Sequence, residues 1–185
     1  MSTLTDNTQS LLHGLHERLL SLVVTHVRVT FTAPEYGVNE FAHLFTHSIL
    51  YLLTTDGKSV EINMGSPSAD TYLGRLMIRR RHFQSHRHAF KHWDFLASTG
   101  LLVRDVLHAI KANGRNLYRF HRSGLGCRHW VRTVIFEFWE LGFIDHSQVH
   151  PLRRFKKEVR YSYPFRLPRV KTNVVKGKFL WETYY

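Results

Sequence analysis

Apolar and polar residues alternate with a period of two along much of the first half of the chain. Residues 26–32 place valine and phenylalanine side chains on one side and polar side chains on the other, which is the pattern of a half-buried strand. Residues 47–64 contain two runs rich in β-branched residues around an Asp-Gly pair, a dipeptide preferred in type I′ turns. Residues 72–83 repeat the apolar alternation. The pattern therefore predicts a β-hairpin and two further strands.

Helical periodicity takes over in the second half. An apolar stripe leads up to the Asn-Gly pair at residues 113–114 and predicts a helix that ends there. Residues 117–120 predict a short strand, and a second helix runs from Cys127 to about Leu141, where a glycine follows. Beyond His150 three prolines break the chain, so we expect extended pieces there.

These elements predict an α+β fold in which helices pack on an antiparallel sheet. We expect a disordered N-terminus over residues 1–8 and a single domain over residues 9–185, with a basic, aromatic C-terminal segment at 150–185. The chain has no run of 18 apolar residues, and its start lacks the basic and apolar regions of a secretory signal. We therefore expect neither a transmembrane helix nor a signal peptide.

The charge of the chain is its main compositional feature. Lys and Arg number 26 against 14 Asp and Glu, a formal net charge of +12, and 14 His accompany them. Such an excess indicates a polyanionic partner such as nucleic acid, against the alternative of a solvated basic surface. Our candidates for tRNA binding are Arg79, Arg80, Arg81, Arg87, Lys91, Arg153, Arg154, Lys156 and Lys157.

Cys127 is the only cysteine, so an internal disulfide is excluded and a reducing, cytoplasmic location is favoured. It follows a Gly-Leu-Gly turn at the predicted start of a helix. Unpaired backbone N–H groups and the helix dipole stabilise a thiolate at such a position, so Cys127 is a candidate nucleophile. The alternative is a buried structural cysteine. No phosphate-binding loop or dinucleotide motif is present, and we predict no cofactor. His82, His86 and His88 lie close together, but no second cysteine and no HExxH motif accompanies them, so we predict no metal.

A nucleophilic thiol needs a base, and His47 opens the first strand of the predicted hairpin. The partner strand carries Glu61 and Asn63, either of which could orient its imidazole. The sequence therefore predicts a catalytic group of Cys127, His47, Glu61 and Asn63. The alternative is that His47 is an exposed residue at a strand start.

This order, a His opening a hairpin and a Cys opening a later helix, resembles the circularly permuted papain-like enzymes. The lecithin retinol acyltransferase-like and NlpC-like groups share it. The separation of 80 residues between His47 and Cys127 suits that layout. The segment GCRHW departs from it, because these groups often carry Asn where Gly126 stands.

Two longer segments, THSILYLLTTDGKSVEINMGSP and NLYRFHRSGLGCRHWVRTVI, resemble a family of small fungal proteins. The likeness spans roughly residues 24–145. It extends to the arginine-containing cyclodipeptide synthases, which build cyclic dipeptides from aminoacyl-tRNA. Ser48 is a departure, since members often have an aromatic residue after the His.

The resemblance implies acyl transfer from an aminoacyl-tRNA ester to Cys127 and then to an amine. An arginyl group would need an acidic pocket, and the sequence does not choose among the candidates Glu61, Asp94, Asp105, Glu137 and Glu140. We take Glu137, with Tyr118 and Trp130 of the quoted segments, as candidates for substrate binding. Two other functions stay open: a papain-like thiol hydrolase or acyltransferase acting on a non-tRNA substrate, and a non-catalytic RNA-binding protein.

Overall fold

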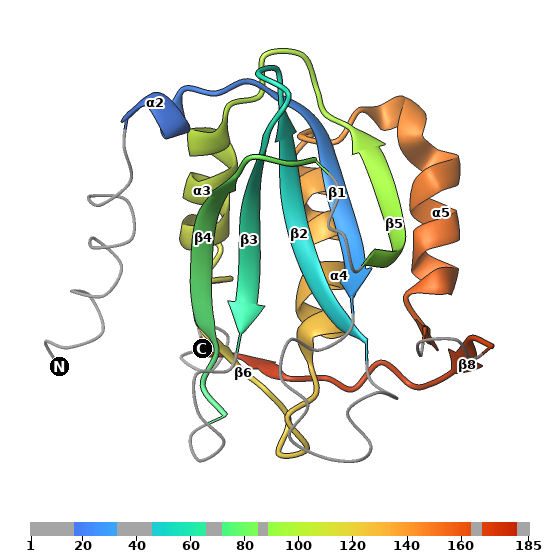
Figure 1. Cartoon of the computed structure of the whole chain (residues 1–185). Helices are drawn as coiled ribbons and strands as arrows, with labels where there is room; N and C mark the ends of the chain where they lie inside the picture. Colours follow the sequence, from blue (N-terminus) through green and yellow to red (C-terminus); the bar gives the residue numbers. More distant parts are fainter. Residues whose placement is uncertain (1–16, 33–45, 66–71, 85–88, 164–167, 181–185) are drawn as a thin grey trace, which may run out of the picture.

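Five antiparallel strands form the main sheet of the computed structural model, in the order β4-β3-β2-β1-β5 (Figure 1). The structure describes residues 17–32, 46–65, 72–84, 89–163 and 168–180. The strands of the main sheet are β1 (Val24–Thr32), β2 (His47–Thr54), β3 (Ser59–Gly65), β4 (Arg75–Arg81) and β5 (Ala89–Leu96). The predicted antiparallel sheet is confirmed.

Three helices cover one face of this sheet, with α4 behind its centre and α3 and α5 towards its two sides (Figure 1). The helices are α2 (Glu17–Leu20), α3 (Val103–Ala112), α4 (Cys127–Glu140), α5 (Val149–Glu158) and the 3-10 turn η2 (His146–Gln148). Two small two-stranded sheets pair β6 (Tyr118–Arg119) with β9 (Lys178–Phe179) and β7 (Tyr161–Ser162) with β8 (Val170–Lys171). The α+β fold class is therefore confirmed.

The hydrophobic core lies between the sheet and these helices. The alternation in β1 buries Val27, Val29 and Phe31 completely, as the pattern predicts. They join side chains of β2 and β3 and the apolar side of α4 in one cluster. Each such side chain stabilises the fold by about 1.5–3 kcal/mol relative to full exposure. This packing fixes where both ends of α4 lie against the sheet.

The hairpin of β2 and β3 forms as predicted, but its turn differs. The loop is four residues long, at 55–58, and only Gly57 among its residues has a positive φ, of 74°. Asp56 accepts a hydrogen bond from the hydroxyl of Thr54 at 2.6 Å. A type I′ turn needs positive φ at both central residues, so that prediction is wrong.

Helix α4 begins and ends where the sequence predicts. Gly142 has φ of 73°, and its N–H donates to the carbonyl of Trp139, while Phe143 donates to Phe138. This is the left-handed glycine termination expected after a helix.

Helix α5 is a correction to the predicted extended tail. Pro151 lies in the first turn of this helix, where its missing N–H interrupts no intrahelical hydrogen bond. Leu152 and Phe155 are buried against the sheet, so an apolar stripe holds a segment whose remaining residues are largely cationic. The proline therefore starts a helix rather than breaking one.

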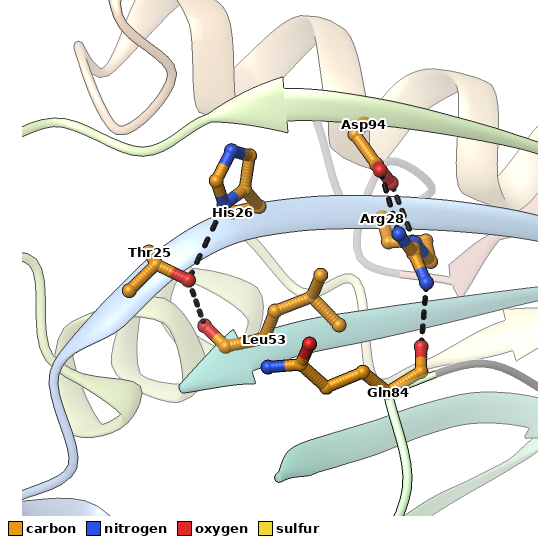
Figure 2. Close-up of polar contacts among 6 residues, drawn as sticks. All are labelled: Thr25, His26, Arg28, Leu53, Gln84 and Asp94. Atoms are coloured by element: carbon orange, nitrogen blue, oxygen red, sulfur yellow. Dashed lines mark hydrogen bonds and ion pairs between the residues drawn. The ribbon is translucent and has the colours of Figure 1, made fainter. Parts of the chain in front are cut away.

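The connection from β4 to β5 joins opposite edges of the sheet. Ser59 donates its hydroxyl to the carbonyl of Phe83 at 2.5 Å, and Arg28 donates to the carbonyl of Gln84 at 2.6 Å. Figure 2 shows Arg28 between Gln84 and Asp94 on the sheet surface. This connection is thus tied to the face opposite the helices. The predicted disorder at residues 1–8 lies outside the described residues.

Candidate functional site

The candidate site lies at the end of the sheet where β2 begins and β3 ends. Cys127 is the first residue of α4, and that helix packs on β2 and β3. Its partly buried thiol lies 3.8 Å from the carbonyl oxygen of Thr46, the residue before β2. The packing of α4 therefore brings the thiol to the strand start that carries His47.

His47 and Asn63 are joined across β2 and β3. The Nε2 atom of His47 lies 2.9 Å from Oδ1 of Asn63, in hydrogen-bonding distance. An amide oxygen accepts, so Nε2 carries the proton in this contact. That tautomer leaves Nδ1 as the basic nitrogen of the ring. The arrangement is the one that a thiol needs from a base that a third residue orients.

Electrostatics around the sulfur favour its ionised form. Burial raises the pKa of Cys127. The hydrogen bond and the charge of His47 both lower this pKa. The backbone N–H of Ser48 and the charge of Arg128 act in the same direction. The net result is a pKa of about 7, below the ordinary value of 9.0. A substantial fraction of the thiol is therefore ionised near neutral pH, as reactive cysteines require.

The helix start supplies backbone donors beside the sulfur. The first intrahelical acceptor is the carbonyl of Gly126, which accepts from Trp130. The N–H groups of residues 127–129 precede that bond and have no intrahelical partner. They carry the positive end of the helix dipole, which stabilises an anion at the thiol.

The hydroxyl of Tyr118 holds the turn that precedes α4. Its hydroxyl donates to the carbonyl of Gly126 at 3.0 Å and accepts from the N–H of Gly177 at 3.0 Å. The ring is 1% exposed, and burial raises the pKa of its hydroxyl. Tyr118 thus positions the helix start, while its buried ring leaves little surface for the substrate contact that the sequence predicted.

Arg128 places a buried guanidinium beside the thiol. The residue is 9% exposed and donates to the hydroxyl of Thr172 at 2.9 Å and the carbonyl of Val159 at 3.4 Å. No carboxylate forms an ion pair with it among the residues described. Its charge therefore acts on Cys127 without a competing anion.

Glu61, the other residue predicted to orient His47, lies in a different contact. It accepts from Arg81 at 2.6 Å and from the hydroxyl of Tyr51 at 3.4 Å, and it is 2% exposed. Asn63 is two residues nearer the site on the same strand, which explains why it, and not Glu61, reaches His47. The structure thus gives Glu61 a buried ion pair.

Trp130 and Glu137 are also not brought to the thiol. Trp130 is completely buried and donates its indole N–H to the carbonyl of Arg115 at 2.7 Å, so it is a core residue. Glu137 follows Cys127 by ten residues on α4, about 15 Å along the axis, and it pairs with Arg115. It lines a separate cavity of about 370 Å³. Neither position suits a group bound at Cys127.

The predicted tRNA-binding residues fall on opposite edges of the sheet. Arg79, Arg80 and Arg81 lie on edge strand β4, where Arg80 pairs with Asp56 and Arg81 with Glu61. Lys91 lies on β5 at the other edge, beside α5. The exposed cations of α5 are Arg153, Arg154, Lys156 and Lys157. Arg87 lies outside the described residues.

Two contacts that support the site are not predicted from the sequence. The backbone N–H of Ser48 and the contact of Gly177 with Tyr118 depend on tertiary packing. No side-chain pattern encodes either contact, although the paired strands β6 and β9 place Gly177 beside Tyr118.

Comparison with known proteins identifies the family but no function. No curated protein and no solved structure matches the chain. Among the described helices, none is long and apolar enough to cross a membrane. A family profile described as a domain of unknown function (DUF7770) matches residues 27–180, which include His47, Asn63 and Cys127. The chain therefore belongs to the DUF7770 family.

Proposed function

We propose that this protein is a thiol acyltransferase in which Cys127 is the nucleophile, His47 the base and Asn63 the residue that orients the base. The observation that carries the proposal is their convergence at the start of α4, where Nε2 of His47 lies 2.9 Å from Asn63 and the pKa of Cys127 falls to about 7. Burial alone would raise that pKa, so a purely structural cysteine has no need of this environment.

We further propose aminoacyl-tRNA as the acyl donor and a cyclic dipeptide, containing arginine, as the product. The support is the resemblance of residues 24–145 to arginine-containing cyclodipeptide synthases and the net charge of +12. The donor is already activated as an ester, so the chemistry needs no nucleotide triphosphate. A cytoplasmic location, where charged tRNA is made, agrees with the single free cysteine.

In the first step the thiolate of Cys127 attacks the ester carbonyl, and backbone N–H groups at the start of α4 stabilise the oxyanion. The carbon–oxygen bond breaks, and the 3′ oxygen of the tRNA takes a proton from the His47 imidazolium. The amine of a second aminoacyl-tRNA then attacks the thioester and gives its proton to His47, and the thiolate leaves. The first residue's amine then attacks the remaining ester, whose carbon–oxygen bond breaks as the ring closes. The amine proton passes to the 3′ oxygen of the second tRNA, which leaves.

One observation favours the same chemistry on a substrate other than tRNA. Arg80 and Arg81 lie in ion pairs with Asp56 and Glu61, so two predicted phosphate contacts already have anionic partners. A papain-like thiol acyltransferase or hydrolase using Cys127 is therefore the second candidate.

The experiment is to incubate the purified chain with arginyl-tRNA and a second charged tRNA and to analyse the products by mass spectrometry. We expect an arginine-containing cyclic dipeptide, and we expect Cys127→Ala to abolish it. Cys127→Ser is the matched control for shape, since it retains a hydroxyl but not a thiolate.

Full activity of the Cys127→Ala protein would rule out both enzymatic functions. Absence of product together with a Cys127 adduct from another activated acyl ester would favour the second candidate. An unreactive thiol would favour a non-catalytic RNA-binding protein.

A further inference from the structure

A cavity of about 480 Å³ lies between edge strand β5 and the first turns of α5. Lys91, His92 and Trp93 line it from the strand, and His150 and Arg154 line it from the helix. Four of these five side chains are cationic or can become so. The cavity therefore favours an anionic ligand.

The carboxylate at this cavity has its charge balanced by a cation outside it. Asp94 is among the lining residues, and both of its oxygens accept from Arg28, each at 2.6 Å (Figure 2). Two parallel N–H···O contacts of this kind form a strong, geometrically fixed pair. Asp94 is thus occupied by Arg28, and the charges of Lys91 and Arg154 are not cancelled by it.

The nearest carboxylate on α5 also has other partners. Glu158 accepts from Arg169 at 2.7 Å and from the hydroxyl of Tyr163. Lys91 contributes to the field at Glu158, and its ammonium lies 5.9 Å from the ring centre of Trp93. Because Arg169 neutralises Glu158, the cavity keeps a net positive charge.

Trp93 forms the inner wall of the cavity. The residue is 7% exposed, and its indole N–H has no acceptor within the part of the chain that the structure describes. A buried donor left without a partner costs about 1–3 kcal/mol. The indole nitrogen has less than 1 Å² of exposed surface, so the cationic side chains, and not this N–H, are the groups that a ligand in the cavity meets.

We propose that the cavity binds a phosphate group. Arg154 can present parallel N–H donors to phosphate oxygens, and Lys91 adds a point charge from the facing strand. The ligand class is a nucleotide or the phosphate backbone of RNA, and the phosphate itself is the recognised group.

The position of the cavity relates it to the thiol. In the sheet Lys91 lies opposite Phe31, and Phe31 lies opposite Ser48, whose N–H acts on Cys127. Two strand spacings separate Lys91 from Ser48 in the sheet, roughly 10 Å. If the proposed function holds, and this link rests on it, the cavity takes a phosphate near the 3′ end of the tRNA while the ester reaches Cys127.

The test is calorimetric titration of the full chain with 5′-AMP, adenosine and inorganic phosphate. We expect AMP to bind at least about tenfold more tightly than adenosine, because the phosphate supplies the charged contacts. We expect the Lys91→Ala/Arg154→Ala double variant to lose AMP affinity by about tenfold or more. Arg104→Ala removes one exposed cation of α3 outside the cavity and serves as the control.

Thermal unfolding checks that each variant is folded, and the single variants Lys91→Gln and Arg154→Gln provide milder changes at the same positions. Binding of inorganic phosphate alone, lost in the double variant, also supports the site. Equal affinity for AMP and adenosine, or unchanged AMP affinity in the double variant, overturns it.

The site and the proposed function fail separately. AMP binding by a protein whose Cys127 is inert to alkylation would leave the phosphate site standing and remove the acyltransferase. A reactive Cys127 in a protein that ignores AMP would do the opposite.

Discussion

Gly126, the residue before the candidate nucleophile, occupies a position where a side chain would be crowded. Its φ is 150°, in a region that favours glycine, and a Cβ there would lie 3.0 Å from the hydroxyl of Tyr118 and 3.2 Å from the ring of Phe120. Permuted papain-like enzymes often carry Asn here, and this chain cannot without moving Tyr118. The departure seen in the sequence therefore has a steric cause.

Gly126→Ala should disturb the start of α4 while leaving the rest of the core in place. The backbone strain and the contact with Tyr118 together should cost about 1–3 kcal/mol of unfolding free energy. We expect slower alkylation of Cys127, measured with iodoacetamide, because the thiol moves relative to His47. Gly124→Ala is the control, since it has a positive φ but open space around it. An alkylation rate unchanged in Gly126→Ala would show that the turn does not position the thiol.

Asn63 and Glu61 can be separated by matched substitutions on one strand. Asn63→Ala removes the acceptor for Nε2 of His47, so we expect the rate of Cys127 acylation to fall by about tenfold or more. Glu61→Gln weakens the pair with Arg81 and should lower the thermal stability instead. Single-turnover acylation and thermal unfolding of both variants make the comparison. Equal loss of acylation in the two would mean that Glu61 also acts on His47.

The arginines of strand β4 differ in their roles, although all of them look like surface cations in the sequence. Arg79 and Arg81 are separated by one residue and lie on the same face of the strand, yet only Arg81 pairs with a buried carboxylate, Glu61. Arg79 is exposed, and its guanidinium makes a weak contact, of 3.6 Å, with the sulfur of Met77. The two arginines are thus alike in sequence and different in environment.

Arg81→Gln should therefore destabilise the protein, whereas Arg79→Gln should not. Losing the partner of a buried Glu61 costs about 2 kcal/mol or more, less than for a fully buried pair because Arg81 is partly exposed. Chemical denaturation of both variants measures the difference. If Arg81→Gln were as stable as the wild type and bound RNA more weakly, the residue would belong to the RNA surface.

The elements that the sequence predicts correctly are those whose packing is local or regular. The alternation of β1, the hairpin of β2 and β3, and the apolar stripe of α4 with its terminal glycine are readable because each pattern repeats over many residues. Helix α5 was missed because Pro151 suggested a break, and only packing against Trp93 and Phe95 shows its buried side. Strand β5 is also not predicted from the sequence, because its buried Trp93 and Phe95 alternate with His92 and Asp94 and follow Lys91.

At the scale of the molecule, the two basic segments lie at opposite edges of the sheet. On β4, two of the four arginines, Arg80 and Arg81, lie in ion pairs, while the four cations of α5 are exposed. The site at the start of β2 lies between these edges. We therefore expect the exposed cations of α5, more than those of β4, to contact the phosphates of an RNA bound near Cys127.

Neutralising Arg153, Lys156 and Lys157 together should weaken tRNA binding and reduce its salt dependence. Each lost phosphate contact lowers the slope of log affinity against log salt by roughly 0.7–0.9. Filter binding across a salt series measures it, with Arg79→Gln as the comparison on β4. A slope that stays constant in the triple variant and falls in Arg79→Gln would assign RNA binding to β4.

The sequence indicates which side chains form the candidate site, but not which residues of the core support them. Cys127 after a glycine turn and His47 at a strand start are local signals, and the partner strand of the hairpin offers Glu61 and Asn63 as the third residue. The choice between them depends on which side chain reaches the imidazole, and the burial of Tyr118 and Trp130 depends on the whole core. These contacts depend on tertiary packing, so they cannot be predicted from a single sequence.

The most direct test of the central claim is the pH dependence of Cys127 alkylation in the wild type and in His47→Ala. The thiolate reacts and the thiol does not, so the rate should rise with pH around a midpoint near 7, the pKa of Cys127. Without His47 the largest lowering influence is gone, and the midpoint should move up by about one unit or more towards that of an ordinary cysteine. A wild-type midpoint near 9, the ordinary value for a cysteine, or one that His47→Ala leaves unchanged, would contradict the account.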